Sequence, residues 1–326
     1  MGKAGKPRGG VGQALLALGD QWSLLILQRA FLKHTRRFAE WREELAVSES
    51  VLAGRLKEMV AGKLLAPSPY RAEGRGRTEY LLTEQAQELW TFLTAIWSWE
   101  RRWVERPHKL PDMVHERCHA RTDAELGCGA CGKAPVTARD TFTERGAANT
   151  FSDIAVHRLH RRTVRENAPR NPLSYLPETM EILGDRWSTV ILAAAFLRMR
   201  RFADFQNELG VAPSILSNRL RRFCELGVLT RHNVGGRGHE YRLTDKGLAF
   251  FPVFAFLVDW AQRWYTAEPE TEIIIMHTAC GKPMTPFFRC RHCHEPLVRQ
   301  EIHFDLSAIA SPIANTEDRA GARSLR

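Results

Sequence analysis

Hydrophobic and polar positions over residues 201–244 predict a helix, a turn, a second helix and a β-hairpin. In the second helix Leu216, Leu220 and Phe223 fall at positions i, i+4 and i+7, so they form one buried stripe. Pro213 suits the first position of that helix, because a backbone N–H at this position would have no hydrogen-bond partner within the helix. A polar, basic helix followed by a basic hairpin is typical of a winged helix-turn-helix, whose second helix enters the DNA major groove. The same pattern also fits an ordinary helical hairpin with a solvated polar face.

The chain carries this pattern twice. Residues 19–23 (GDQWS) return as residues 184–188 (GDRWS). Further matches, in the same order along the chain, pair Arg37 with Arg201, Arg55 with Arg219, Glu79 with Glu240, Trp99 with Trp260 and Cys118 with Cys280. Ordered matches over such a length indicate a tandem duplication, and two copies are too few for a solenoid. We therefore expect two domains of the same fold.

Two helices in each copy are candidates for an interface. Short lead-in helices are predicted at residues 14–18 and 178–183, and Thr83 and Thr244 each cap a long helix rich in Trp and Phe. These aromatic helices carry more apolar surface than one small domain buries, so part of it should face the other copy or a second chain. An intramolecular pseudo-dimer and a homodimer of tandem chains both satisfy this expectation.

Cysteine and histidine recur in two sets with the same spacing. Each copy has an HxxC pair, nine intervening residues and a CxxC pair. Two such pairs offer four thiolate or imidazole ligands and no open position, which is the pattern of a structural zinc ribbon. His119, His292 or His294 could substitute as ligands, and a reduced loop whose thiols only pack is the alternative. The predicted sites, one per copy, are His115, Cys118, Cys128 and Cys131, and His277, Cys280, Cys290 and Cys293.

Charge and apolar content narrow the class of protein. The 326-residue chain has a formal net charge of +10 and a pI near 9.5, which favours an anionic partner such as nucleic acid. No apolar run approaches the roughly 20 residues of a membrane span, and the basic N-terminus lacks an apolar signal core. We therefore expect a cytoplasmic, nucleoid-associated protein. No Gly-rich phosphate loop or nucleophile elbow occurs in the sequence, so an enzyme is not expected.

Several motifs together resemble a known family. GDRWS before an apolar helix, the triplet RRF, the tripeptide GVL and a wing ending in EYRLT are similar to those of HxlR-type winged-helix regulators. The resemblance implies a bacterial transcription factor that binds double-stranded DNA, without catalytic residues and with an unknown small-molecule effector. Many members carry an HxxC…CxxC tail, but most have one domain and dimerise, so the duplication is a departure. The resemblance places the DNA-reading helices at 213–223 and 49–59 and the wings at 230–244 and 66–83.

The expected DNA contacts fall into three groups. Asn can read adenine and Arg can read guanine through paired hydrogen bonds, whereas Arg–phosphate contacts fix register and Arg in a narrow minor groove senses A·T-rich DNA. Base contacts are expected from Ser214, Ser217, Asn218 and Arg221; phosphate contacts from Arg36, Arg37, Arg200, Arg201 and Arg222; wing contacts from Arg75, Arg77, Arg237 and His239. On the copy-one helix Ser50 and Lys57 are also expected to contact DNA, and Lys57 should do so without sequence preference.

The two reading helices differ at equivalent positions. Asn218 is replaced by Gly54, and Arg222 is replaced by Glu58. Copy one has thus lost hydrogen-bonding side chains, so we expect copy two to read bases and copy one to anchor the complex. The alternatives are a protein-interaction adaptor, or a metal- or redox-responsive regulator, that kept the winged fold with weak DNA reading.

These observations predict a mainly α protein of the α+β type with two winged helix-turn-helix domains. The expected segments are winged domains at 1–108 and 178–268, zinc-ribbon-like β segments at 109–140 and 269–306, a linker at 141–177 and a disordered tail at 307–326.

Overall fold

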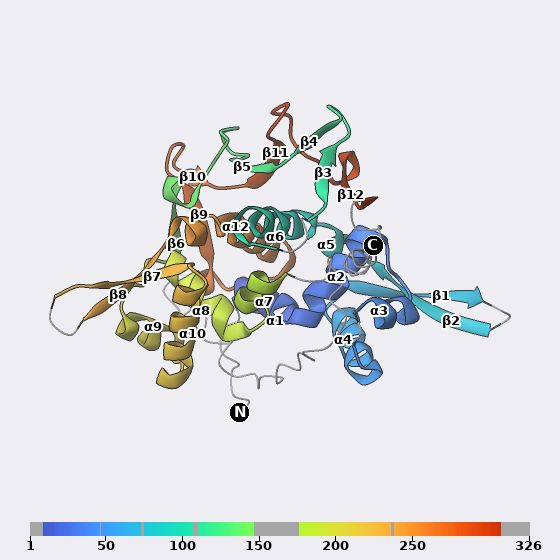
Figure 1. The fold of residues 1–326 in the computed structure, drawn as a ribbon, viewed down its shortest axis with the longest axis horizontal. Helices are drawn as coiled ribbons and strands as arrows, with labels where there is room; N and C mark the ends of the chain where they lie inside the picture. Colours follow the sequence, from blue (N-terminus) through green and yellow to red (C-terminus); the bar gives the residue numbers. More distant parts are fainter. Residues whose placement is uncertain are drawn as a thin grey trace, which may run out of the picture.

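The computed structural model describes residues 9–45, 47–72, 75–106, 110–146, 176–235 and 238–307. Within these ranges two winged helix-turn-helix domains are followed by small β segments rich in Cys and His, which confirms the predicted mainly helical class (Figure 1). None of the described helices is long and apolar enough to span a bilayer.

Each copy has the same order of elements. In copy one these are α1 (Gly10–Leu18), α2 (Gln21–Lys33), α3 (Phe38–Leu45), α4 (Glu49–Ala61), β1 (Leu65–Ala72), β2 (Arg75–Leu82), α5 (Glu84–Gln87) and α6 (Trp90–Trp103). In copy two they are α7 (Pro177–Leu183), α8 (Arg186–Phe196), α9 (Phe202–Leu209), α10 (Pro213–Glu225), β7 (Leu229–Asn233), β8 (His239–Leu243), α11 (Asp245–Leu248) and α12 (Phe251–Trp264).

The long aromatic helix predicted after each capping threonine is instead two helices. Thr83 caps only the four-residue α5, and Thr244 caps the equally short α11. After the short helix the backbone forms a tight turn with an i to i+3 hydrogen bond. In copy one the Leu89 N–H donates to the Ala86 carbonyl at 3.0 Å. This tight turn ends the short helix before the aromatic helix begins.

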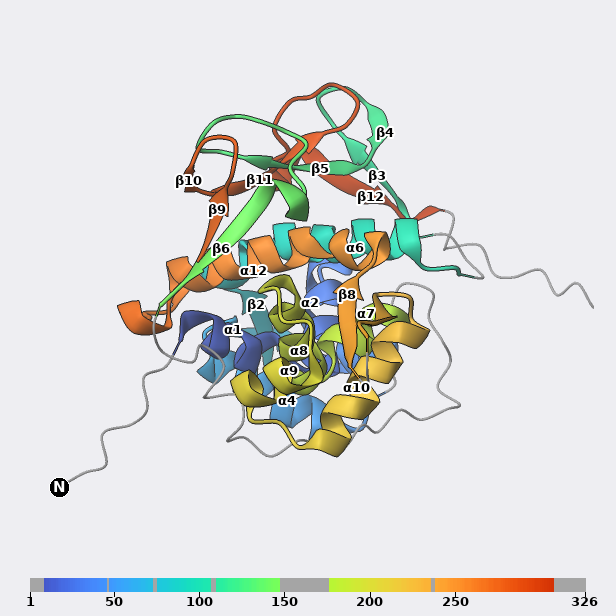
Figure 2. The same cartoon turned by 90° about the vertical axis from the view of Figure 1, so that its left-hand side faces the viewer.

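The Cys- and His-rich segments of the two copies interleave. Copy one supplies β3 (Asp112–His115), β4 (Ala120–Thr122), β5 (Ala124–Cys128) and β6 (Thr141–Arg145); copy two supplies β9 (Ile273–His277), β10 (Lys282–Pro283), β11 (Pro286–Cys290) and β12 (Ile302–Asp305). The sheets have the strand orders β12-β3-β4, β10-β9-β6 and β11-β5, so every sheet joins strands of both copies (Figure 2). The stretch predicted to be a linker therefore begins with a strand, β6, that pairs antiparallel with β9.

The predicted interface between copies is present within the chain. Helices α6 and α12 pack against each other, α1 packs on α12, and α7 packs on α6. The Trp99 indole N–H donates to the Lys246 carbonyl at 2.9 Å, and its counterpart Trp260 donates to the Gln85 carbonyl at 2.8 Å. These matched bonds relate the two copies by an approximate two-fold axis, and the buried residues of both form one continuous core.

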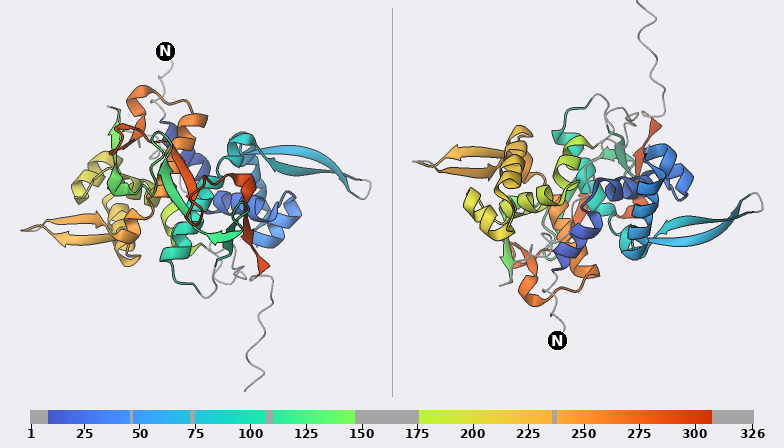
Figure 3. Two further views of the ribbon diagram at one scale, coloured as in Figure 1. Left: turned by 90° about the horizontal axis from the view of Figure 1, so that it is seen from above. Right: turned by 90° about the horizontal axis from the view of Figure 1, so that it is seen from below.

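The architecture has three layers. The second helices of the two helix-turn-helix units, α4 and α10, lie at one end, and the interleaved β segments lie at the opposite end (Figure 1). Helices α6 and α12 lie between these layers (Figure 2). The β1–β2 and β7–β8 hairpins project outward on opposite sides (Figure 3). One chain thus presents both α4 and α10 on the same face.

Candidate nucleic-acid interface and metal centres

The repeated GDxWS motif positions each reading helix. Asp20 caps α2 by accepting from the backbone N–H groups of Trp22 and Ser23, at 2.9 and 3.2 Å. The same carboxylate pairs with Arg55 of α4 at 3.3 Å. In copy two Asp185 caps α8 and pairs with Arg219 of α10 at 2.8 Å. Each aspartate therefore links the N-terminus of the helix that it caps to the second helix of the helix-turn-helix. This link fixes the position of one helix relative to the other.

Helix α10 divides cleanly into a buried stripe and an exposed face. Leu216, Leu220 and Phe223 are buried, as the spacing predicts. The four residues expected to contact bases are all exposed, namely Ser214, Ser217, Asn218 and Arg221. Arg221 donates to the Asn218 side-chain oxygen at 3.1 Å, so two of the expected base readers lie next to each other on this face.

Arg222 lies beside this face and already has partners. Its guanidinium is 3.4 Å from Glu181 and 3.1 Å from Glu225, and hydrogen bonds to Glu225 are the largest effect raising its pKa. A phosphate would have to compete with both carboxylates for this side chain, so Arg222 is less available than Arg221.

The exposed face of helix α4 has fewer hydrogen-bonding side chains than that of α10. Ser50 and Lys57 are exposed beside Ala53, Gly54 and Glu58. Leu52, Leu56 and Met59 are buried on the opposite side. The helix is thus placed like α10 but offers fewer hydrogen-bonding side chains, as the sequence comparison indicates.

The RRF segments and the wings form one basic edge in each copy. The Tyr80 N–H donates to the Arg36 carbonyl, and the Tyr241 N–H donates to the Arg200 carbonyl, both at 2.8 Å. These bonds add each arginine pair to the edge of its hairpin. The side chains expected to contact phosphate are exposed in both copies, on Arg36, Arg37, Arg200 and Arg201.

The wing residues are described only in part. Arg77 and His239 are exposed, and the His239 ring nitrogen Nδ1 lies 2.7 Å from the Asn233 side-chain oxygen. Arg75 begins β2, but its side chain lies outside the described residues, as does the whole of Arg237. The copy-one hairpin pairs over eight residues on each strand and the copy-two hairpin over five, so the copy-one wing is longer.

Four tight turns carry the candidate metal ligands. In each turn the residue after the second ligand has a left-handed backbone, with φ between 54° and 72° at His119, Gly132, Gly281 and His294. Three of these residues donate back to the carbonyl of the first ligand, for example Gly132 to Cys128 at 2.8 Å. His119 and His294 thus serve as turn residues, and neither belongs to a ligand group of the described chain.

These turns bring the eight predicted ligands together in two clusters, but not as one cluster per copy. The His115 cluster contains His115, Cys118, Cys290 and Cys293, and the His277 cluster contains Cys128, Cys131, His277 and Cys280. The predicted grouping within each copy is therefore wrong. Because β3 pairs with β12, β5 with β11 and β6 with β9, each HxxC turn meets the CxxC turn of the other copy.

The spacing of the ligand atoms fits a tetrahedral metal ion. Cys118 and Cys293 Sγ each lie 3.4 Å from His115 Nδ1, and Cys118 Sγ lies 3.9 Å from Cys290 Sγ. With metal–sulfur and metal–nitrogen bonds of about 2.3 and 2.05 Å, a zinc tetrahedron has edges of about 3.6 Å for S–N and 3.8 Å for S–S. The His277 cluster repeats this geometry, with Cys131 and Cys280 Sγ at 3.4 and 3.3 Å from His277 Nδ1.

In the His115 cluster the surroundings favour the thiolate form of Cys290. Burial raises the pKa of Cys290, but hydrogen bonds with the Thr122 hydroxyl and the backbone N–H groups of Cys293 and His292 outweigh burial and lower it to about 6. Both histidines are fully buried, and their Nε2 atoms lack hydrogen-bond partners among the described residues. Four ligands leave no open position, so these clusters suit a structural metal and not a catalytic one.

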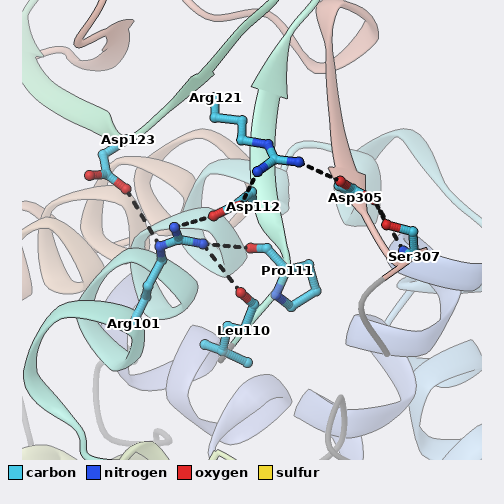
Figure 4. Close-up of polar contacts among 8 residues, drawn as sticks. All are labelled: Arg101, Leu110, Pro111, Asp112, Arg121, Asp123, Asp305 and Ser307. Carbon is cyan, nitrogen blue, oxygen red and sulfur yellow. Dashed lines mark hydrogen bonds and ion pairs between the residues drawn. The ribbon is translucent and has the colours of Figure 1, made fainter. Parts of the chain in front are cut away.

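Polar contacts tie the clusters to the helices between the copies (Figure 4). Arg101 near the end of α6 donates to the Leu110 and Pro111 carbonyls at 3.2 and 3.0 Å and pairs with Asp112 of β3. Arg121 of β4 joins Asp112 to Asp305 of β12, at 3.5 and 3.3 Å. The strands around the His115 cluster are thus anchored on α6, one of the two helices that hold the copies together.

The winged domains match one protein family twice. The model for HxlR-like helix-turn-helix proteins matches residues 17–108 and again residues 182–269, together more than half of the chain. The chain belongs to the HxlR-like helix-turn-helix family. The two matching regions place two HxlR-like units in one polypeptide. This membership confirms the resemblance drawn from the motifs.

Bacterial relatives are named as regulators of transcription. An uncharacterised HTH-type transcriptional regulator of Mycobacterium tuberculosis, MT3179, is 33% identical over 125 residues, which are 38% of this chain and 79% of that protein. YvaP of Bacillus subtilis, another such regulator, is 30% identical over 27% of this chain and 83% of its own length. Proteins of this family regulate transcription and are not enzymes, which confirms the expectation that this chain is not an enzyme.

Solved structures of candidate transcription factors also match. PA1607 is 31% identical and covers 42% of this chain and 93% of its own, with a TM-score of 0.35. PA1374 from Pseudomonas aeruginosa is 27% identical and covers 44% of this chain and 96% of its own, with a TM-score of 0.31.

Sequence reasoning missed the residues that hold the reading helices. Arg55 and Arg219 were noted only as repeated positions, yet each pairs with the aspartate of the GDxWS motif. The sequence did contain a signal for this contact, because the aspartate of the GDxWS motif and the arginine of the second helix both recur in the two copies. Sequence alone did not show that they are in contact.

Proposed function

We propose that this HxlR-like regulator binds double-stranded DNA as a built-in pseudo-dimer, with one chain covering two half-sites. The observation that supports this most strongly is that α4 and α10 lie on one face while both wings extend from its sides (Figure 1). Membership of the HxlR-like family supports the DNA-binding role. The matched hydrogen bonds of Trp99 and Trp260 support the two-fold arrangement within the chain. Such a protein would act in the cytoplasm, at the nucleoid.

Copy two is proposed to read the sequence. Ser217, Asn218 and Arg221 are exposed on α10, where an amide can pair with adenine and a guanidinium with guanine. At the equivalent positions α4 carries Ala53, Gly54 and Lys57. Copy one therefore contributes mainly phosphate contacts through Lys57, the RRF arginines and its longer wing.

Selection of bound sites from random DNA tests this function. The expected result is a two-part site in which one half is strongly specified and the other weakly specified. Binding should weaken steeply between 50 and 200 mM salt, since phosphate contacts release counterions. Absence of any enriched site, together with weak binding that ignores sequence, would favour a protein-interaction adaptor instead.

We also propose that both clusters hold zinc as a structural ion. The support is the closed set of one imidazole and three thiolates at tetrahedral spacing. Bound zinc would join the HxxC turn of one copy to the CxxC turn of the other. Elemental analysis of protein purified without chelator should find about two zinc ions per chain, and less than half an equivalent would contradict the proposal.

A further inference from the structure

A cavity lies on the copy-one side of the approximate two-fold axis. It is enclosed by α2 and α6 of copy one and by the end of copy two around β12, which lies over α2 (Figure 1). Its free space is about 50 Å³. Since a water molecule needs at least roughly 10–15 Å³, this space can hold several of them. The aromatic side chains that line it are Phe31, Trp90, Trp97 and Phe304.

A guanidinium without a carboxylate lies at this cavity. Arg299, in the short 3-10 helix η4 (Arg299–Glu301), is half-buried and stacks over the Phe31 ring with 5.8 Å between its carbon Cζ and the ring centroid. It donates only to the Phe31 and Ile302 carbonyls, at 3.3 and 3.4 Å, and no carboxylate of the described chain pairs with it. Burial lowers the pKa of Arg299, which is the expected effect of desolvation without a compensating anion.

Two further polar atoms of the lining lack partners. The Gln28 side-chain oxygen and the Trp97 indole N–H are buried, and neither has a hydrogen-bond partner in the described ranges. Buried polar groups are normally hydrogen-bonded, so unpaired ones at a cavity indicate that a bound molecule completes them. The lining thus offers one cation, one acceptor and one donor around an aromatic space.

The other side of the approximate two-fold axis shows that the fold does not require these polar groups. At the positions equivalent to Arg299 and Gln28 that side has Ala138 of copy one and Ala193 of copy two. In place of Leu93 it has Phe254, whose ring packs on Phe196 with centroids 5.3 Å apart. The same region is therefore more apolar and filled by a phenyl ring in one copy, and open, charged and polar in the other.

We propose that the copy-one cavity binds a one-ring aromatic carboxylate. The carboxylate pairs with Arg299, the ring lies among the aromatic side chains, and a hydroxyl on the ring donates to the Gln28 side-chain oxygen. Because Arg299 comes from copy two and α6 from copy one, the ligand would contact both halves of the pseudo-dimer. The consequence for transcription rests on the proposed function, but ligand binding itself does not.

Calorimetry without DNA tests the site on the full chain, so its failure is distinct from a failure of DNA binding. The probe is 4-hydroxybenzoate, and 4-hydroxybenzyl alcohol is the matched neutral compound. The acid should bind saturably at one site per chain, and the alcohol at least tenfold more weakly. Arg299→Met should weaken the acid by about ten- to hundredfold, since it removes a charged hydrogen-bonding partner.

Two more variants separate the cavity from general anion binding. Leu93→Phe copies the ring that fills copy two and should abolish binding while Arg299 remains. Arg139→Met removes an exposed arginine that pairs with Asp245 elsewhere, and it should bind the acid like the wild type. Equal affinity for acid and alcohol in the wild-type chain, no detectable binding of the acid, or unchanged binding in Leu93→Phe would each overturn the proposal.

Discussion

Each cluster combines ligands from both copies, which we call the crossed arrangement. Counting the zinc ions bound to ligand variants tests this arrangement. Cys118→Ser with Cys290→Ser removes two ligands from the His115 cluster and none from the other, so about one zinc ion per chain should remain. Cys118→Ser with Cys128→Ser removes one ligand from each cluster, so both ions should be weakened. If each copy held its own metal, the two results would be interchanged.

The expected weakening follows from the four-ligand geometry. Structural zinc sites contribute roughly 10–16 kcal/mol of apparent binding free energy, so one of four ligands accounts for about 2.5–4 kcal/mol. That loss lowers affinity by about two to three orders of magnitude. Dialysis against a chelator of intermediate zinc affinity will therefore strip a three-ligand cluster and leave a four-ligand cluster loaded.

Elemental analysis after dialysis is the readout. Cys224→Ser is the control, because Cys224 lies outside both clusters and is half-buried near the end of α10. It should retain two ions. One ion in Cys118→Ser/Cys128→Ser and none in Cys118→Ser/Cys290→Ser would refute the crossed arrangement.

Three further predictions concern reading and stability. Arg221→Ala should cost roughly 1–3 kcal/mol of DNA binding and relax specificity at one position, whereas Lys57→Ala should weaken all sequences alike; equal loss of specificity would show that the copies read equally. Trp260→Phe should lower the free energy of unfolding in urea by roughly 1–3 kcal/mol, because a buried backbone carbonyl loses its donor, and an unchanged stability would remove that bond from the interface. Gly210→Ala should destabilise by roughly 1–2 kcal/mol because φ is 59°, whereas the exposed, helical Gly54→Ala, with open space around it, should stabilise by roughly 0.5–1 kcal/mol.

Local features were predictable because local spacing determines them. The stripe of Leu216, Leu220 and Phe223 and the first-turn Pro213 are as the sequence indicates. Each depends on the chain within a few residues. The lead-in helices and the aromatic helices also form the predicted interface, since a duplicated self-complementary surface can close on itself.

The partners of the HxxC and CxxC turns could not be predicted from the sequence. An HxxC turn and a CxxC turn complete the same tetrahedron whether they come from one copy or from two. The choice is made by long-range strand pairing, of β5 with β11 and β6 with β9, and no local pattern encodes that pairing. The break between α5 and α6 was missed for a different reason, because apolar residues continue across the tight turn at Leu89.

The stoichiometry of the DNA complex tests most directly whether one chain is a complete DNA-binding unit. A duplex carrying the selected two-part site is titrated with the protein, and the mass of the complex is measured by native mass spectrometry. One 37.2 kDa chain bound to one duplex is the predicted result, and it should persist when the protein is in moderate excess. Two chains on every two-part duplex, with no one-chain complex at any ratio, would contradict it.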